Sequence, residues 1–207
     1  DEGTVTLNTS LKNTNLTALN GKYLRKDQAD STAYQLSITN TTDATSGGAG
    51  ALKVSGGIYA AKKIYGSQIY NAVWNDYAEF RQAEIVEPGR VIIEDASGEM
   101  KLSTERLQPG GNIVSDTFGH AMGETDDCKT PIAVAGRVLA YTNEDRDSYP
   151  LGAAVCTGPN GTVSLMTREE IREYPERIVG TVSEIPNYEI WGTGNVKVNG
   201  RIWIKVK

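Results

Sequence analysis

Two carboxyl groups lie three residues apart in the segment Trp74-Asn75-Asp76-Tyr77-Ala78-Glu79-Phe80, where three aromatic residues surround them. Residues spaced at i and i+3 face the same way on a helical turn but opposite ways on a strand. Apolar neighbours raise the pKa of a carboxyl group, so a protonated acid can coexist with an ionised base. Asp76 and Glu79 therefore have the minimum equipment for acid–base attack on an amide. The alternative interpretation is that Asp76 caps a turn and Glu79 is exposed.

The remaining residues exclude several other kinds of site. His120 is the only histidine, which excludes sites that need two histidines and argues against structural zinc. A Ser-His-Asp triad would have to use His120, yet its neighbours have no nucleophile-elbow signature. Cys128 and Cys156 are too few for a disulfide framework, and we expect both to be reduced packing residues. The sequence predicts no metal and no cofactor.

Length and charge narrow the class of protein further. The 207 residues allow one domain or two small ones, and the net charge is −5. Binding to a phosphate backbone needs a concentrated cationic face, so we expect no nucleic-acid partner. No apolar run approaches the roughly 20 residues that span a bilayer, so we expect no membrane insertion. No signal peptide is visible, although a chain that starts with Asp1 leaves a removed leader as an alternative.

The first 74 residues differ in kind from the rest of the chain. They are nearly neutral, whereas the remainder is acidic, and ten of the fourteen residues from Ser37 to Gly50 are Ser, Thr, Asn or Gly. In a monomer such a sequence cannot bury enough apolar surface to offset the cost of ordering its backbone. Residues 1–74 are therefore either a disordered linker or a slender shaft whose apolar residues are buried between chains.

The spacing of the apolar residues favours the shaft. They are sparse but regular, and no heptad is sustained: Val5, Leu7, Leu11, Leu16, Leu19, Tyr23, Leu24, Leu36 and Ile38. Short β-prone pieces punctuated by glycine follow at 51–54, 57–59, 64–65, 69–70 and 73–74. We expect these pieces to pack as β structure between chains, in a homotrimer.

Residues 75–207 read as a compact, mainly β domain with one short helix. Strands are expected at 91–93 after a Pro-Gly turn, at 132–141, and in a hairpin formed by 153–156 and 163–165. Thr167 and Glu170 form a capping box for a helix that ends at Pro175. Asn199-Gly200 predicts a type I′ hairpin between 196–198 and 201–206.

The motif Asp76-Tyr77-Ala78-Glu79 after a β-prone fibre segment resembles the start of the C-terminal autoproteolytic chaperone domain of phage appendage and tailspike proteins. These domains are glutamic peptidases of the preneck-appendage type. The resemblance spans about 74–207 and continues through 114–119, 178–183 and 194–204. Upstream, 22–30 and 50–57 are similar to segments common in phage fibre shafts.

The resemblance implies an intramolecular chaperone that helps three chains assemble and then cuts itself off just before Asp76. The cleaved bond would be Asn75–Asp76, with Asp76 and Glu79 as the catalytic carboxylates. The resemblance therefore implies a structural protein of a bacteriophage virion. It would be a trimeric tail fibre, tailspike or head fibre, assembled in the host cytoplasm. Its partners would be other virion proteins and a host cell-surface glycan or protein.

Two alternatives stay open beside the structural role. One is an active self-cleaving protease rather than an uncleaved cap. The other is a carbohydrate-binding tip, since aromatic rings can stack on sugars; the candidates are Tyr141, Tyr188, Trp191 and Trp203. Such aromatic residues are more often part of a core.

Overall fold

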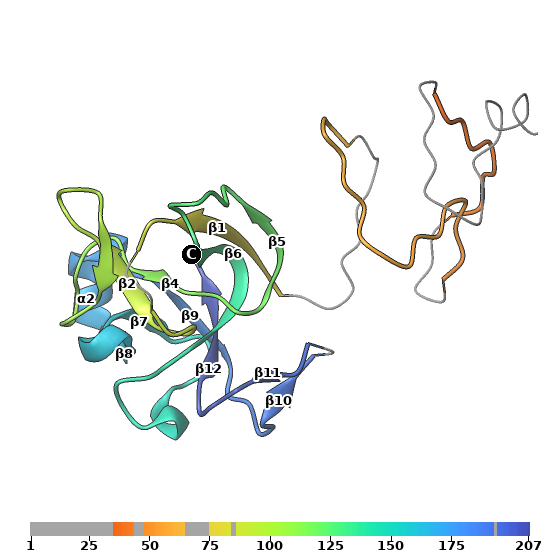
Figure 1. Ribbon diagram of the computed structural model, residues 1–207. Coiled ribbons are helices and arrows are strands. Elements are labelled where there is room, and N and C mark those ends of the chain that lie inside the picture. Colours follow the sequence, from red (N-terminus) through yellow and green to blue (C-terminus); the bar gives the residue numbers. More distant parts are fainter. Residues whose placement is uncertain (1–34, 44–47, 65–74, 84–85, 193) are drawn as a thin grey trace, which may run out of the picture. The chain divides into compact units, whose positions relative to one another are not determined.

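The computed structural model describes residues 35–43, 48–64, 75–83, 86–192 and 194–207 (Figure 1). The chain divides into two compact units, Asp1–Gly66 and Ser67–Lys207. Trp74, the apolar positions predicted between Val5 and Leu24, and the short pieces at 69–70 and 73–74 lie outside the described residues.

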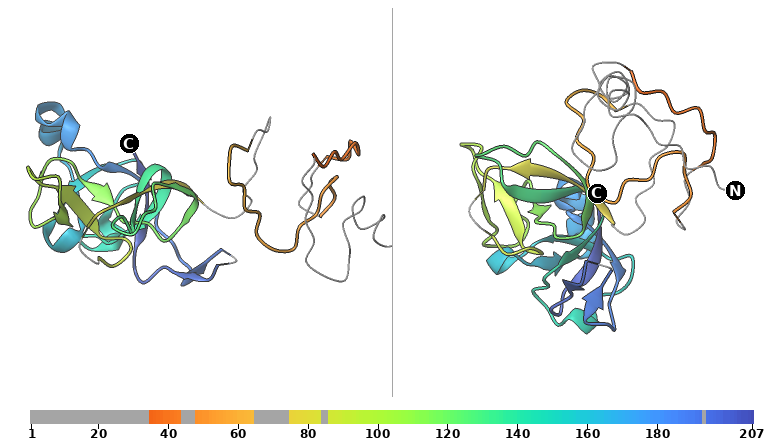
Figure 2. Two further views of the ribbon diagram at one scale, coloured as in Figure 1. Left: turned by 45° about the horizontal axis from the view of Figure 1, so that its top comes forward. Right: turned by 45° about the vertical axis from the view of Figure 1, so that its right-hand side comes forward.

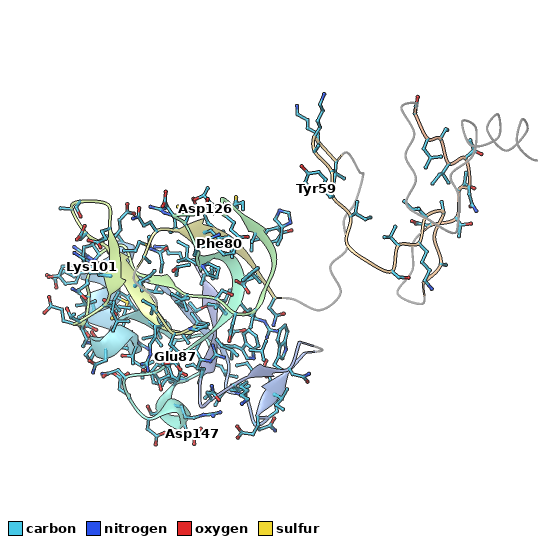
Figure 3. The ribbon with its side chains drawn as sticks, in the orientation of Figure 1. Tyr59, Phe80, Glu87, Lys101, Asp126 and Asp147 are labelled. Atoms are coloured by element: carbon cyan, nitrogen blue, oxygen red, sulfur yellow. The ribbon has the colours of Figure 1, made fainter. Side chains whose placement is uncertain are left out.

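In the first unit, residues 35–43 and 48–64 contain neither helix nor strand within one chain. Their large apolar side chains are exposed, and Tyr59, labelled in Figure 3, is 91% exposed. The others are Leu36, Ile38, Leu52, Val54, Ile58 and Ile64. One copy of the chain therefore leaves these side chains in water, and β packing between copies stays a prediction.

The second unit is mainly β, which confirms the predicted class. Its twelve described strands are β1 Asp76–Arg81, β2 Val91–Glu94, β3 Met100–Leu102, β4 Asn112–Ile113, β5 Phe118–Met122, β6 Thr130–Ala140, β7 Ala154–Thr157, β8 Val163–Leu165, β9 Gly180–Glu184, β10 Ile190–Trp191, β11 Val196–Lys197 and β12 Ile202–Val206. The helix α2 covers Arg168–Glu173, and short 3₁₀ turns occur at Arg146–Ser148, Pro159–Gly161 and Pro175–Arg177.

Seven strands form the main sheet in the order β5-β1-β6-β12-β9-β7-β8. Strand β1 pairs in parallel with β5, whereas the other neighbours in this sheet are antiparallel. A three-stranded sheet has the order β3-β2-β4, and β10 pairs with β11 in a ribbon. The ribbon lies at the end of the second unit away from α2 (Figures 1 and 2).

Strand β6 joins the two halves of the main sheet because it changes partner along its length. Residues 130–136 pair with β1, and residues 137–140 pair with β12. At the change lies Gly136, with a φ of 104° that favours glycine. A Cβ atom at Gly136 would lie 2.3 Å from the carbonyl oxygen of Asn75. A close backbone approach thus requires a residue without a side chain.

Several local predictions are confirmed. Strand β6 lies where a buried strand is predicted, although only Ile132, Ala133 and Val138–Ala140 of it are buried. Strands β7 and β8 form the predicted hairpin around Pro159–Gly161. Helix α2 has the predicted capping box, in which Thr167 and Glu170 each accept a hydrogen bond from the other's backbone N–H. It ends before Pro175, whose ring cannot continue a helix.

The predicted hairpin at the end of the chain is wrong in its pairing, although the turn is correct. Asn199 and Gly200 have φ values of 51° and 74°, and the N–H of Arg201 donates to the carbonyl of Val198. However, β11 pairs with β10, while β12 pairs with β6 and β9. Both edges of β12 are thus occupied inside the sheet, and the turn redirects the chain rather than registering two strands.

Three apolar clusters hold the second unit together. Alternate residues of β12 contribute to two of them: Ile202 and Ile204 to the largest, Trp203 to another with Leu139 and Val198. A further cluster joins Ile92, Met100, Val114 and Ile132 between the two larger sheets. Because β12 is buried on both faces, a shift of register there would disturb two clusters at once.

We expect Gly136→Ala to lower the free energy of unfolding by about 2–4 kcal/mol, since it adds backbone strain and a clash with Asn75. Gly152→Ala is the matched control, because Gly152 has a φ of 79° but open space around its Cα. Urea unfolding of both variants measures the difference. Equal losses would mean that the contact with Asn75 does not constrain β6.

Candidate functional site

The Asp76–Glu79 segment is the start of strand β1, so the strand alternative applies rather than the helical turn. Neighbouring strands flank β1 on both sides, and the register shifts leave an extra residue on each neighbour rather than on β1. Asp76 and Ala78 are buried, whereas Tyr77 between them is 55% exposed. This alternation places Asp76 and Glu79 on opposite faces of the strand.

Asp76 lies in a pocket of short polar side chains and is 4% exposed. Its Oδ1 accepts a hydrogen bond of 2.8 Å from the hydroxyl of Thr117, and the N–H of Thr117 donates to Ser115 Oγ at 3.0 Å. The second oxygen, Oδ2, is buried with no hydrogen-bond partner among the described residues. An ionised carboxylate would need more donors than this pocket supplies.

Burial raises the pKa of Asp76 to about 6, because removal from water penalises the charged form. Hydrogen bonds from Thr117 and Ser115 act in the opposite direction, and the nearby charge of Asp116 raises the pKa further. Near neutral pH both the protonated and the ionised form of the Asp76 carboxyl group are therefore present. A carboxyl group with such a pKa can act as an acid or as a base.

Glu79 has a different environment from Asp76. Its side chain is 42% exposed and lies 3.9 Å from Arg81 Nη1, which is on the same face of β1. Arg81 also reaches Glu94 on β2, with 3.2 Å between Nη2 and Oε1. Within one chain the structure does not bring the two predicted catalytic carboxyl groups together.

The Asn75–Asp76 bond itself is held on both sides. The N–H of Asn75 donates to the carbonyl of Thr117, and the carbonyl of Asn75 accepts from the N–H of Arg137, both at 3.1 Å. The side-chain Nδ2 of Asn75 is buried without a hydrogen-bond partner in the described part of the chain. A donor aimed at a carbonyl oxygen is one element of an oxyanion hole.

An ion pair between a buried arginine and a partly exposed aspartate fixes the loop that holds Asp76. Arg201 is 2% exposed and makes two hydrogen bonds to the carboxylate of Asp116, at 3.0 and 2.9 Å. Its Nε donates to the carbonyl of Val198. Because Asp116 stands between Ser115 and Thr117, the pair connects the start of β12 to the pocket around Asp76.

Sequence reasoning missed most of this pocket. Ser115 and Thr117 fall within the stretch 114–119 of the resemblance without individual roles, and the sequence pattern indicates no functional role for Gly136 or Arg201. Glycine inside an otherwise apolar strand often marks a close backbone approach, so Gly136 carried a usable signal. Arg201 carried none, because its partner is 85 residues away in the sequence.

The other candidate chemistries receive little support from the structure. Trp203 is fully buried, donates its indole N–H to Tyr188, and has Trp191 packed edge-on against it. Tyr141 lies under the guanidinium of Arg90 and donates to Glu87. The four aromatic residues do not form one exposed platform for a sugar.

The described residues show neither a metal cluster nor a membrane-spanning helix. Across the described ranges, no group of three or more His, Cys, Asp or Glu side chains is placed to hold a metal ion. His120 packs instead against the ring of Tyr77, with 5.4 Å between centroids. In the same part of the chain, no helix is both long and apolar enough to cross a membrane.

Comparison with known proteins adds no assignment. A scan against models of protein families finds no match, and a search of curated proteins finds no match either.

We expect Arg201→Met to lower the free energy of unfolding by about 1.5–3 kcal/mol, because it removes the hydrogen bonds of the guanidinium to Asp116 and to the carbonyl of Val198. Lys129→Met is the control: Lys129 lies 3.7 Å from Glu124 in an exposed pair, and its loss should cost at most about 1 kcal/mol. Chemical denaturation measures both. A small loss for Arg201→Met would show that the pair does not hold the loop.

The raised pKa of Asp76 predicts a stability that falls with pH. Between about pH 4 and pH 6 the folded state binds more protons at Asp76 than the unfolded state, so the free energy of unfolding decreases as pH rises. The loss amounts to about 2–3 kcal/mol. Asp76→Asn should remove it and stabilise the protein at pH 7, as measured by urea titration at several pH values.

Glu79→Gln removes a carboxylate from the same strand and serves as the control for that titration. The decrease of stability between pH 4 and 6 should persist in it. An unchanged pH profile in Asp76→Asn would contradict the assignment of the raised pKa to Asp76.

Proposed function

We propose that this chain is a structural protein of a bacteriophage virion, a homotrimeric tail fibre, tailspike or head fibre. Residues 1–74 form the shaft, and residues 75–207 form a domain that drives folding and trimer assembly. Attachment to other virion proteins and to a glycan or protein on the host surface follows from such a position. The sequence resemblance supports the proposal, and the exposed apolar side chains of the first unit carry it physically.

Those side chains need a partner of similar chemistry. Leu52, Ile58 and Ile64 are 63%, 69% and 71% exposed, and each lies in a stretch without secondary structure in one chain. Burying apolar surface contributes about 25 cal/mol per Å², so leaving this many large side chains in water costs free energy that association recovers. Copies of the same chain carry identical apolar surfaces. In a closed ring of three copies, each copy buries its apolar surface against its neighbours.

The second unit can form its own cores before association. Its three clusters are buried within one chain, and Trp203, Ile202 and Ile204 are fully covered. A domain that folds alone and joins its copies can align three shafts at one end. We call a domain that folds alone and then aligns the shafts an assembly domain.

A second function, self-cleavage at Asn75–Asp76, is favoured by one observation. The bond lies beside a buried carboxyl group whose pKa is raised to about 6, and its carbonyl oxygen accepts the N–H of Arg137. A proton donor and an oxyanion donor at one peptide bond are two of the groups that amide cleavage requires, beside a nucleophile. Cleavage there would separate residues 1–75 from the assembly domain.

Light scattering during size-exclusion chromatography tests the assembly proposal. The full chain should elute with three times the mass of one chain. Leu52→Ser combined with Ile58→Ser should reduce the trimer fraction at least tenfold at low micromolar concentration. Ser37→Asn combined with Ser55→Asn, which changes exposed polar positions in the same unit, should leave it unchanged. A stable monomer of the parent chain would overturn the proposal.

A further inference from the structure

The Asn75–Asp76 bond needs a nucleophile if it is to be cut, and the structure limits the choice. Glu79 is on the opposite face of β1 and faces Arg81, so within one chain it is not placed to activate water at this bond. The side-chain amide of Asn75 is covalently next to the carbonyl. Its Nδ2 is buried and has no hydrogen-bond partner among the described residues that would hold it away.

We propose, as an extension that rests on the self-cleavage proposed above, that the side-chain amide of Asn75 cuts the bond by cyclising onto its own backbone carbonyl carbon. The new bond joins Nδ2 to this carbon, and the bond from the carbon to the nitrogen of Asp76 breaks. The carboxyl group of Asp76 gives one proton to the departing nitrogen, and the carboxylate that remains takes up the proton that leaves Nδ2. The products are a succinimide at the end of residues 1–75 and a free amine on Asp76.

This step balances without any co-reactant. Water, oxidant and metal are not consumed, because the nucleophile and the leaving group belong to the same chain. The ring that forms has five members, and an intramolecular attack of this kind replaces a second-order reaction by a first-order one. Water opens the succinimide later, at either carbonyl, to give asparagine or isoasparagine as the last residue.

The neighbours of the bond are arranged for this reaction. The N–H of Arg137, whose nitrogen lies 3.1 Å from the carbonyl oxygen of Asn75, would stabilise the negative charge that develops there. Gly136 packs its backbone against the same carbonyl, which fixes its direction. The carboxyl group of Asp76 belongs to the residue whose nitrogen departs, so it can supply the proton that this nitrogen needs.

Intact-mass spectrometry of the full chain during incubation at pH 6–7 in ¹⁸O-labelled water tests the proposal. The fragment that begins at Asp76 should appear together with residues 1–75 lighter by one water than the hydrolysis product. The early fragment should carry no ¹⁸O, and its later form should be a mixture of asparagine and isoasparagine ends. The initial rate should not depend on protein concentration.

Two variants separate this chemistry from hydrolysis. Asn75→Ala removes the nucleophile and should abolish the fragment, with an unchanged circular dichroism spectrum as the check on folding. Asn112→Ala removes an amide that donates to the carbonyl of Gly110 elsewhere in the domain, and it should cleave like the parent chain.

The outcomes distinguish the two levels of the proposal. Cleavage of Asn75→Ala, or an early fragment with ¹⁸O and a single asparagine end, would overturn the role of Asn75 and leave self-cleavage standing. If the parent chain yields no fragment at all, self-cleavage and the role of Asn75 are both wrong. The trimer measurement is independent of either result.

Discussion

The contact between Arg201 and Asp116 is the constraint on which the candidate site depends. A guanidinium removed from water is stable only when its hydrogen bonds are satisfied, and Asp116 and the carbonyl of Val198 accept them. The pair determines where the loop before β5 lies. From that position Thr117 contacts Asp76 with its hydroxyl and Asn75 with its carbonyl oxygen. The positions of the bond and of its neighbouring carboxyl group thus follow from an ion pair far away in the sequence.

A second constraint acts from the opposite side of the same bond. Gly136 brings β6 so close to Asn75 that a methyl group would not fit, and Arg137 then directs its N–H at the carbonyl oxygen. Asp76 remains buried with one oxygen unpaired, which destabilises its charged form. The second unit therefore carries the free-energy cost of a buried carboxyl group with an unpaired oxygen at the start of β1. Polar groups left unsatisfied in a buried position are expected where function, rather than stability, determines the residue.

Local signals predicted much of the fold, and contacts between distant residues account for the rest. The capping box of Thr167 and Glu170, the strand 132–141 and the turn at Asn199-Gly200 depend on neighbouring residues, and each is present. The partner of β12 was predicted wrongly, because a turn signal does not reveal that both edges of a strand are already occupied. In the site, Asp76 was recognised from its motif. The roles of Thr117, Gly136 and Arg201 depend on long-range packing that spacing does not encode.

The two units divide two physical tasks. The second unit buries the side chains of its own apolar clusters, whereas the described part of the first unit leaves apolar side chains such as Ile58 and Tyr59 in water. We propose that association of copies resolves that imbalance. A cryo-electron microscopy map of the full chain in solution tests it most directly. The account predicts three copies around one axis, with Leu52, Ile58 and Ile64 of each copy covered by the other two. A map with a single copy, or with these side chains exposed to solvent, would contradict it.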